Sequence, residues 1–435
     1  MKDTARLRRR ILSHEASIAV LGQGYVGLNV ASAAAQAGFT TVGIDVSGVR
    51  IDDLDRGVLS VPGVPEEYFR NALATGRLTF STGPDPIDWS EIVLICVPTP
   101  LRDHTPDLTY VEDACREVAA HLSSARLVIL ESTTYPGTTD QLVKPILEST
   151  GRQAGRDFLL AYSPERIDPG NEEFGFSRIP RIVGGITPEA TGVTTLFYEQ
   201  LVDKVAAVSS CRAAELAKLL ENTFRHVNIA LVNEMATFCH DLEIDVWEVI
   251  EAAATKPFGF MPFYPGPGVG GHCIPLDPTY LSWQVRRAAG RQFRILEQAE
   301  DVNTQMPKWV ASRIAEALNE LGKPVKGSRI LALGVAYKPD VGDIRESPSI
   351  RVMEQLSRRG AKIAFHDPFV ESVVVNGTDL YRTELSRSAV AEADCVALLT
   401  PHHSYDLDWF AEQASLVFDA RNSYGAARYE NVVRL

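Results

Sequence analysis

The sequence lacks any apolar run that approaches the roughly 20 residues of a membrane-spanning helix. It also lacks the continuous apolar segment of a secretory signal peptide, although Arg6 and residues 8–10 make the N-terminus basic. We therefore expect a cytoplasmic protein with no membrane partner. Residues 1–15 are expected to form a short helical extension, and the sequence does not indicate its purpose.

Cysteine and positive charge are also scarce. The six cysteines are scattered and form no C-x-x-C pair, so we expect a reducing compartment, no disulfide framework and no metal site. The formal net charge is −13, whereas a surface that binds nucleic acid or an anionic membrane needs a basic face. We expect no nucleic-acid partner, and an anionic small ligand would need local Arg, Lys or helix N-termini.

The length predicts more than one domain, because a single hydrophobic core stops growing at roughly 250–300 residues. Hydrophobic residues make up 45% of the sequence and charged residues 23%, as in an ordinary globular protein. From the pattern along the chain we place the predicted domains at residues 1–200, 201–322 and 323–435.

The first domain begins with a strand, a helix and a second strand. Residues 17–22 form an apolar run that ends in glycine, a helical pattern follows over 28–37, and residues 41–45 form the next strand. Further strands are predicted at 91–97 and 126–131. Strands that alternate with helices predict a parallel, doubly wound sheet.

Gly22, Gly24 and Gly27 form a G-x-G-x-x-G motif between the first strand and the first helix, and Asp45 ends the second strand. In this context the glycines allow a tight turn and a close approach of the pyrophosphate to the helix N-terminus. Asp45 would bind the adenosine ribose hydroxyls and repel a 2′-phosphate, which favours NAD over NADP, although Arg50 weakens that preference.

The middle of the chain has a different composition. Between Cys211 and Lys256 there is neither Gly nor Pro, and apolar residues recur at helical spacing. Residues 257–278 are rich in Pro and Gly and predict a loop with special backbone conformations. We therefore expect a central helical block that contains one irregular segment.

The early pattern returns after Pro324. Residues 329–334 resemble the first strand, 362–367 the second, and 394–401 the later strand that ends at proline. The fold class is therefore α/β, with two Rossmann-like, doubly wound parallel-sheet domains joined by the central helical block. No spaced glycines follow Gly334, so the second domain is expected to hold another ligand, and a nucleotide-bearing substrate fits this duplication.

Residues 266–278 place Cys273 in a glycine-dense loop, with Asp277 four residues further on. A single cysteine is more often a small buried apolar residue than a nucleophile. Glycines, however, allow a ligand to approach the backbone closely. The loop therefore favours a reactive thiol.

At these motifs the chain resembles the UDP-glucose/GDP-mannose dehydrogenase family. The resemblance spans nearly the whole chain, and the matching segments are residues 22–27, 131–134, 163–170, 215–222, the loop around Cys273 and 337–347. It implies a four-electron oxidation of a sugar C6 alcohol with two molecules of NAD. A homodimer or a higher homo-oligomer is expected by this resemblance alone.

The resemblance also implies the catalytic roles. Cys273 would trap an aldehyde as a thiohemiacetal, which is oxidised to a thioester and then hydrolysed. Lys218 and Asn222 share a helix face and would stabilise negative charge on oxygen. Asp277 would act as a base through an ordered water that Thr134 holds, and Glu165 would help thioester hydrolysis.

Two sets of binding residues follow from the motifs and the resemblance. The cofactor-binding set is Gly22, Gln23, Gly24, Tyr25, Val26, Gly27, Asp45, Arg50, Pro98, Thr99, Thr134 and Arg345. The substrate-binding set is Glu165, Arg166, Lys218, Asn222, Phe263, Tyr264, Gly270, Lys338 and Arg421.

The loop around the cysteine also bears on the choice of sugar. The UDP-glucose branch typically has Ser before the cysteine and Lys before the aspartate, whereas this chain has His272 and Leu276. With the aromatic residues of 256–264, this is most like UDP-N-acetylglucosamine 6-dehydrogenases. UDP-N-acetylmannosamine and UDP-glucose are the successive alternatives.

Two other functions agree with part of the sequence pattern. A two-electron hydroxyacid dehydrogenase of the phosphogluconate type would explain Lys218 and Asn222, but it leaves Cys273 and the second α/β domain without a role. A nucleotide-sugar binder without turnover would keep the fold but would not need Cys273, Lys218 and Asp277.

Overall fold

The computed structural model describes residues 2–61, 63–102, 105–168, 175–271, 274–425 and 429–435. The chain separates into two units, of which the first comprises Met1–Glu221 and Thr279–Ala289 and the second Asn222–Pro278 and Gly290–Leu435. The division into three domains at residues 200 and 322 stays a prediction.

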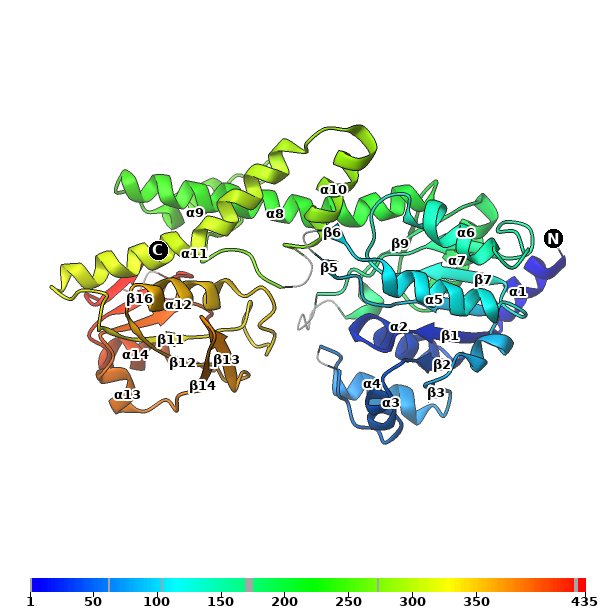
Figure 1. Cartoon of the computed structure of the whole chain (residues 1–435), viewed down its shortest axis with the longest axis horizontal. Coiled ribbons are helices and arrows are strands. Elements are labelled where there is room, and N and C mark those ends of the chain that lie inside the picture. Colours follow the sequence, from blue (N-terminus) through cyan, green and yellow to red (C-terminus); the bar gives the residue numbers. More distant parts are fainter. Residues whose placement is uncertain (1, 62, 103–104, 169–174, 272–273, 426–428) are drawn as a thin grey trace. The chain divides into compact units, whose positions relative to one another are not determined.

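The first unit is built on an eight-stranded sheet in the order β10-β9-β8-β7-β4-β1-β2-β3, shown in blue to green in Figure 1. The strands are β1 (Ser17–Leu21), β2 (Thr40–Ile44), β3 (Leu78–Ser81), β4 (Ile92–Ile95), β7 (Leu127–Leu130), β8 (Leu159–Tyr162), β9 (Arg181–Gly185) and β10 (Val205–Ala207). The strand order reverses between β1 and β4, so the carboxyl ends of these strands form the crevice in which open α/β sheets bind ligands.

One part of this sheet departs from the predicted parallel arrangement. β9 pairs antiparallel with β8, and β10 runs parallel to β9. Parallel neighbours need a long crossover, usually a helix. The described part of the connection between β8 and β9 holds only the 3₁₀ turn Phe176–Arg178, so the chain returns in the opposite direction.

Helices and one short hairpin accompany this sheet in the N-terminal part of the first unit. They are α1 (Lys2–Leu12), α2 (Tyr25–Gln36), α3 (Gly48–Asp55), α4 (Glu66–Ala74), β5 (Leu101–Arg102), β6 (Thr105–Pro106), α5 (Thr109–Ala120), α6 (Lys144–Glu148) and α7 (Pro188–Tyr198). The predicted N-terminal helix is α1, which packs on α7. Its Leu7 and Ile11 are fully buried with Phe197 in the main apolar core, so this extension belongs to the folded unit.

α8 (Cys211–Asp241) begins in the first unit and continues in the second, where α9 (Val246–Ala254) follows. The break between them has Glu243 at φ 56°, and the Asp245 side chain caps α9 by accepting from the Trp247 amide. Large apolar side chains of α8 stay exposed at Leu216, Leu220, Phe224, Leu231, Met235 and Phe238. We call this set the apolar face of α8.

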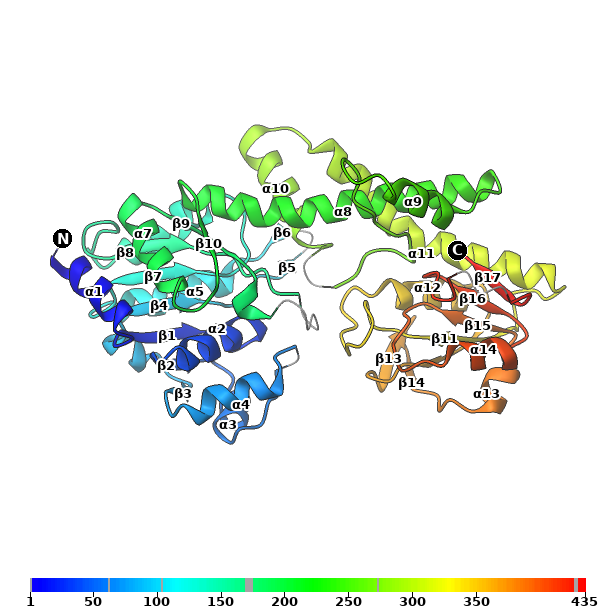
Figure 2. The same cartoon turned by 180° about the vertical axis from the view of Figure 1, so that it is seen from behind.

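The second unit contains a five-stranded sheet in the order β12-β11-β15-β16-β17, in which all pairs are parallel. Figure 2 shows it from behind in yellow to red. Its elements are α11 (Arg294–Glu320), β11 (Arg329–Leu333), α12 (Pro348–Arg358), β12 (Lys362–His366), β13 (Ser372–Val375), β14 (Thr378–Tyr381), α13 (Arg387–Ala391), β15 (Cys395–Leu398), α14 (Leu407–Gln413), β16 (Val417–Asp419) and β17 (Val432–Arg434). This is the second nucleotide-type fold that the sequence predicts.

Both faces of this sheet are buried. Ile330 and Ala332 of β11 belong to one apolar cluster with α11 and α12, while Leu331 and Leu333 belong to another with Phe410 of α14. A continuous apolar strand is typical of a parallel sheet that is covered on both sides. None of the described helices combines the length and the apolar character that a membrane span requires.

Candidate active site

The glycine turn after β1 has the geometry that the motif predicts. Gly22 has φ +88°, and its amide donates to the Ile44 carbonyl over 2.7 Å. A Cβ at this position would lie 2.6 Å from the Cys96 carbonyl oxygen. A residue with a side chain would therefore be strained and would collide with the backbone directly after β4.

The other two glycines shape the start of α2. A Cβ on Gly27 would lie 1.8 Å from the Gly22 carbonyl oxygen, so only glycine lets the helix approach the turn this closely. Gly24 is the N-cap of α2 without a side-chain cap, and a Cβ there would meet nothing within 4 Å. The helix N-terminus therefore has open space in front of it, which fits the pyrophosphate of a dinucleotide.

Asp45 lies directly after β2 and is 7% exposed. Its carboxylate accepts from the Gln23 amide over 2.7 Å, from the Ser47 amide over 2.9 Å and from Arg50 Nη1 over 2.8 Å. This holds the carboxylate next to the glycine turn, where the predicted ribose contact requires it. Arg50 is the neighbouring cation that the sequence predicts.

The remaining cofactor-binding predictions of the first unit lie at the same edge of the sheet. Tyr25 and Val26 form the half-buried first turn of α2. Pro98 is exposed after β4, whereas Thr99 is buried and its carbonyl accepts from the Tyr280 hydroxyl over 2.8 Å. Their contact with NAD stays a prediction.

Glu165 is buried, and both of its carboxylate oxygens accept hydrogen bonds. Its Oε1 accepts from the backbone amides of Arg166 and Ile167, each over 2.6 Å, and its Oε2 accepts from Arg181 Nη2 over 2.7 Å. Arg166 in turn pairs with Glu221 of α8 over 2.7 Å. The loop that carries Glu165 is thereby attached to the helix that carries Lys218.

A second attachment joins α8 to the loop after β7. Glu215 accepts from the amides of Gly137 and Thr139 over 2.6 and 2.9 Å, and from the Thr139 hydroxyl over 2.7 Å. Burial raises the pKa of Glu215, and these hydrogen bonds oppose the shift. Thr134 lies in the same loop, and its fully buried hydroxyl has no hydrogen-bond partner among the described residues.

Lys218 lies on α8 between these two attachments and is 7% exposed. Among the ion pairs of the described residues, none involves this lysine. A buried ammonium group without a carboxylate partner is costly, and such groups are common where a site binds an anion. This setting suits the predicted role at a developing oxyanion.

In the second unit, Asn222 and Asp277 come together although 55 residues separate them. Asn222 Nδ2 donates to Asp277 Oδ2 over 2.5 Å, and both residues are buried. Asp277 is the first residue of α10 (Asp277–Ala289), where a helix N-terminus stabilises a carboxylate. The structure thus joins two of the predicted catalytic side chains.

His272 and Cys273, the predicted nucleophile, lie outside the described residues. Within the second unit, the glycines before them pack closely on the segment after β11. The Gly271 amide donates to the Arg345 carbonyl over 2.9 Å, and a Cβ on Gly270 would lie 2.8 Å from the Tyr337 Cβ. The loop therefore needs glycine where it meets the segment after β11.

Arg421, two residues after β16, contacts the same loop. A Cβ on Gly266 would lie 2.3 Å from Arg421 Nη1, so the guanidinium covers this glycine. Burial lowers the pKa of Arg421 to about 10, and Asp419 opposes the shift. The loop and the predicted substrate-binding arginine are thus neighbours.

The other predicted binding residues of the second unit are less buried. Phe263 is half-buried and meets the Phe224 ring edge-on at 5.7 Å, and Tyr264 stacks on Trp247 at 6.1 Å. Lys338 is half-buried after β11. Arg345, predicted near the cofactor phosphates, is exposed and forms a bidentate pair with Asp343, so its contact with the cofactor stays a prediction.

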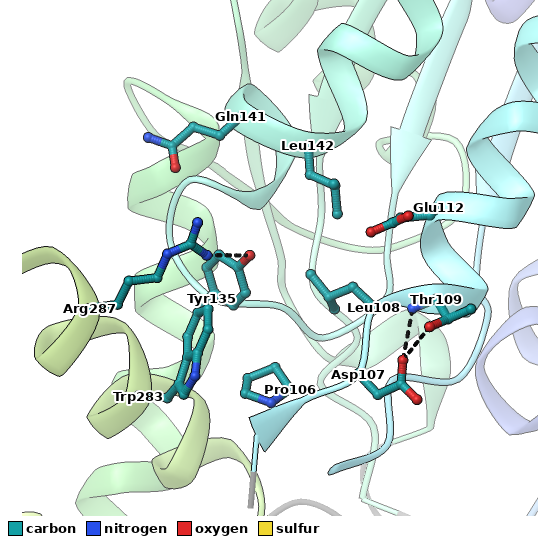
Figure 3. Close-up of a pocket in the computed structure, with 10 residues that line it drawn as sticks. All are labelled: Pro106, Asp107, Leu108, Thr109, Glu112, Tyr135, Gln141, Leu142, Trp283 and Arg287. Atoms are coloured by element: carbon teal, nitrogen blue, oxygen red, sulfur yellow. Dashed lines mark hydrogen bonds between the residues drawn. The ribbon is translucent and has the colours of Figure 1, made fainter. Parts of the chain in front are cut away.

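The first unit also holds a cavity of about 440 Å³ that no predicted site residue lines. Figure 3 shows Tyr135 and Trp283 side by side, with Arg287 over the indole. The centroids of the two rings are 4.8 Å apart, and Arg287 Nη1 reaches the Tyr135 hydroxyl over 3.5 Å. The aromatic and cationic groups of this wall therefore already contact one another.

The sequence-based assignment missed four buried residues: Glu131, Arg181, Tyr198 and Glu215. Glu131 and Glu215 lie inside the matching segments but received no role. Glu131 directly follows an apolar strand, and Arg181 opens one. A charged residue in such a place is unusual, and this was a signal in the sequence for both. Tyr198 lies at the end of an ordinary helical pattern, which gave no such signal.

Comparison with known proteins identifies the family. Three models of the UDP-glucose/GDP-mannose dehydrogenase family match the chain: the NAD binding domain over residues 16–202, the central domain over 212–305 and the UDP binding domain over 331–426. The chain belongs to this family.

Individual relatives are also named as dehydrogenases of nucleotide sugars. The NDP-N-acetyl-D-galactosaminuronic acid dehydrogenase of Ralstonia nicotianae is 34% identical over 95% of this chain and 97% of its own. The UDP-N-acetyl-D-mannosamine dehydrogenase of Escherichia coli K12 is 34% identical over 90% of this chain and 94% of its own. The solved UDP-D-ManNAc dehydrogenase of Pyrococcus horikoshii superposes with a TM-score of 0.87 at 32% identity, covering 96% of this chain and 98% of that one.

Family membership confirms the predicted enzyme class, the cofactor and the α/β fold. The protein is an NAD-dependent nucleotide-sugar dehydrogenase, and its first domain binds NAD. The second nucleotide-type fold corresponds to the UDP binding domain of the family, in agreement with a nucleotide-bearing substrate.

Proposed function

We propose that this dehydrogenase oxidises the C6 alcohol of a UDP-N-acetylhexosamine to the carboxylate in a four-electron reaction. The observation that carries the proposal is the Asn222–Asp277 hydrogen bond, which joins two predicted catalytic groups in a chain of this family. When bound, NAD accepts the electrons of both oxidations. The substrate, the product and the residue roles below are parts of this proposal.

The chain's own groups would divide the chemistry. Asp277 accepts the alcohol proton through a water held by Thr134, and Lys218 with Asn222 stabilises the oxygen anion. The Cys273 thiol adds to the aldehyde carbon, and the resulting thiohemiacetal is oxidised to a thioester. Water then attacks the thioester carbonyl with help from Glu165, so that the C–S bond breaks and the thiol is restored.

The identity of the sugar rests on the loop and on the relatives. His272 and Leu276 favour an N-acetylated sugar, and the sequence alone points first to UDP-N-acetylglucosamine. The E. coli and P. horikoshii relatives are named for N-acetylmannosamine, which supports the manno epimer as the second sugar to test. Apolar contact with an acetamido methyl gives only about 1–3 kcal/mol of discrimination, so some UDP-glucose turnover is compatible with the proposal.

The test is a side-by-side assay of UDP-N-acetylglucosamine, UDP-N-acetylmannosamine, UDP-N-acetylgalactosamine and UDP-glucose with NAD. We expect two NADH per sugar consumed and a uronate as product. A higher kcat/KM for UDP-glucose than for every N-acetylated sugar would overturn the sugar assignment. One NADH per sugar would favour a two-electron hydroxyacid dehydrogenase, and binding without NADH would favour a non-catalytic binder.

Replacing the predicted nucleophile tests the covalent route. We expect Cys273→Ala to abolish uronate formation, because neither the thiohemiacetal nor the thioester forms without the thiol. Cys273→Ser should stall at a slowly hydrolysed ester. Product analysis by mass spectrometry checks this, and uronate formation by the alanine variant at the rate of the unmodified enzyme would refute the role of Cys273.

We further infer that the chain forms a homodimer or a higher homo-oligomer. The apolar face of α8 supports this, because contiguous exposed apolar side chains are typical of protein interfaces. Light scattering on the unmodified protein and on Leu231→Glu gives the test. A monomer in the unmodified protein at micromolar concentration would contradict the inference.

A further inference from the structure

Four buried side chains of the first unit form a network: Glu131, Glu165, Arg181 and Tyr198. Glu131 directly follows β7, Glu165 lies three residues after β8, and Arg181 opens β9. β8 and β9 pair antiparallel, with Tyr162 opposite Gly184. Continuing that register places Glu165 opposite Arg181, at the edge of the sheet where α/β folds bind their ligands.

The guanidinium of Arg181 is held from several sides. Nη2 donates to Glu165 Oε2 over 2.7 Å, and Nη1 lies 3.3 Å from Glu131 Oε2 and from the Pro164 carbonyl oxygen. The group also lies 4.6 Å from the centroid of the Phe176 ring and is only 2% exposed. A planar cation fixed in this way determines the position of the carboxylate that it binds.

Tyr198 supports the network from α7. Its hydroxyl donates to Glu131 Oε1 in a short hydrogen bond, and its ring faces Arg181 at 5.4 Å. Burial raises the pKa of Tyr198 well above its ordinary value, and Glu131 adds to that shift, so the hydroxyl stays a donor. Tyr68 and Cys96 also face the network, and burial raises the pKa of each, so both stay neutral.

The network contains two carboxylates and one permanent cation. Burial raises the pKa of Glu131 to about 7, although Arg181 lowers it, and Glu165 adds to the increase. Burial lowers the pKa of Arg181, but the two carboxylates raise it more. Glu131 therefore binds a proton more readily than an exposed carboxyl group does, and the shorter contact of Arg181 is with Glu165.

We propose that Arg181 is a positioning residue that keeps Glu165 oriented for thioester hydrolysis, with Glu131 and Tyr198 holding Arg181 in place. The inference rests on the proposed function. In the step concerned, Glu165 accepts a proton from the attacking water, whose oxygen bonds to the thioester carbonyl carbon. The C–S bond then breaks, and the thiolate of Cys273 leaves and takes up a proton.

The main test compares Arg181→Met and Arg181→Lys with the unmodified holoenzyme, using the best substrate of the sugar panel. For Arg181→Met we expect a normal burst of two NADH per active site, followed by a steady-state rate lower on the order of 100-fold. Intact-mass analysis of the working enzyme should then show the acyl adduct on the protein. Arg181→Lys keeps the charge and should restore part of the rate and reduce the adduct.

Arg152→Met is the matched control. Arg152 also lies over a phenylalanine ring, at 5.9 Å from the Phe158 centroid, but it donates to the carbonyls of Ala125 and Asp157. We expect no adduct in this variant. A folded Arg181→Met that loses the burst and the steady-state rate equally, without adduct, would overturn the inference and leave a structural role.

Glu131→Gln gives a test that does not depend on the folding of Arg181→Met. The amide imitates protonated Glu131, so we expect hydrolysis to continue and the inflection of the steady-state pH–rate profile near pH 7 to disappear. An unchanged pH–rate profile would overturn the proposal that Glu131 acts on Glu165 through Arg181. Failure of the proposed function itself is distinguishable, because the unmodified enzyme would then not release two NADH per sugar.

Discussion

Two glycine turns, one in each unit, have nearly the same backbone geometry. Gly22 follows β1 with φ +88°, and Gly334 follows β11 with φ +79°. Each donates its amide to the last residue of the neighbouring strand, over 2.7 Å to Ile44 and 2.9 Å to His366. In each unit an aspartate after that strand accepts from the amide directly after the glycine: Asp45 accepts from Gln23, and Asp367 accepts from Val335.

The surroundings of the two turns differ. In the first unit α2 begins at Tyr25, three residues after the glycine, whereas in the second unit the next helix, α12, begins only at Pro348. Asp367 also bonds a buried imidazole, His402 Nε2, over 3.0 Å, whereas Asp45 pairs with the partly exposed Arg50.

This comparison separates the turn from the binding site. The tight glycine turn is a property of the strand-to-strand packing and recurs without the full G-x-G-x-x-G motif. A helix N-terminus that follows the turn at once can bind an anion directly, and α2 of the first unit is placed in this way. The corresponding segment of the second unit instead packs against Gly270 and Gly271.

The largest expected effect comes from replacing the two turn glycines. A Cβ on Gly334 would lie 2.1 Å from the Thr400 carbonyl oxygen, and one on Gly22 would lie 2.6 Å from that of Cys96. We expect Gly334→Ala and Gly22→Ala each to destabilise its unit by about 3 kcal/mol, since a positive φ and overpacking act together. Urea unfolding measures this.

The two turns should also differ in the ligand that depends on them. Gly22→Ala should weaken NAD binding and spare UDP binding, and Gly334→Ala should do the reverse. Gly24→Ala is the control for stability, because a Cβ there meets nothing within 4 Å and the φ is negative. Equal losses of both ligands in both glycine variants would show that the turns do not act separately.

The second prediction concerns the buried aspartate of the second unit. Burial raises the pKa of Asp367, but the hydrogen bonds from His402 and from the Phe369 and Val335 amides lower it more. Its ionised form therefore stabilises the fold above the unfolded pKa of about 3.9, and this stability is lost as the pH falls through the folded pKa. We expect Asp367→Asn to cost about 2 kcal/mol at pH 7.

Urea unfolding of both proteins from pH 7 down to pH 3 is the measurement. The difference in unfolding free energy between them should shrink only below about pH 4. A difference that does not change with pH would mean that the charge of Asp367 contributes nothing.

The smallest effect is expected at Asp45. Asp45→Ala should shift the ratio of kcat/KM for NAD and NADP by about tenfold toward NADP, because the carboxylate no longer repels a 2′-phosphate. Adding Arg50→Met to that variant should reverse part of the shift, since Arg50 is then the nearby cation. Equal use of both cofactors by the unmodified enzyme would refute the role of Asp45.

Much of the fold was predictable from periodicity. The apolar runs at 17–22 and 329–334 and the glycines after them correspond to β1 and β11, because a strand buried on both faces leaves a continuous apolar pattern. The reversal at β9 was not predictable, since an apolar segment such as 181–185 has the same pattern in either direction.

The candidate site was predictable only in part. Gly22 and Asp45 carry a mechanism in their spacing. The catalytic roles of Asn222 and Asp277 followed from family resemblance alone, and the hydrogen bond between them was not predicted. The ion pair between Arg181 and Glu165 depends on the strand reversal. It could therefore not be predicted from a sheet in which all strands are expected to be parallel. Cys273 lies outside the described residues, and its role stays a prediction.

The Glu131–Arg181 contact also bears on how the chain is made. Glu131 precedes its cation by 50 residues, so during synthesis it leaves the ribosome well before Arg181 does. Before β9 arrives, Glu131 has no cation to pair with, so burying it in its ionised form is unfavourable. Nascent chains that stop between β8 and β9 should therefore depend on chaperones more than chains that include residue 181.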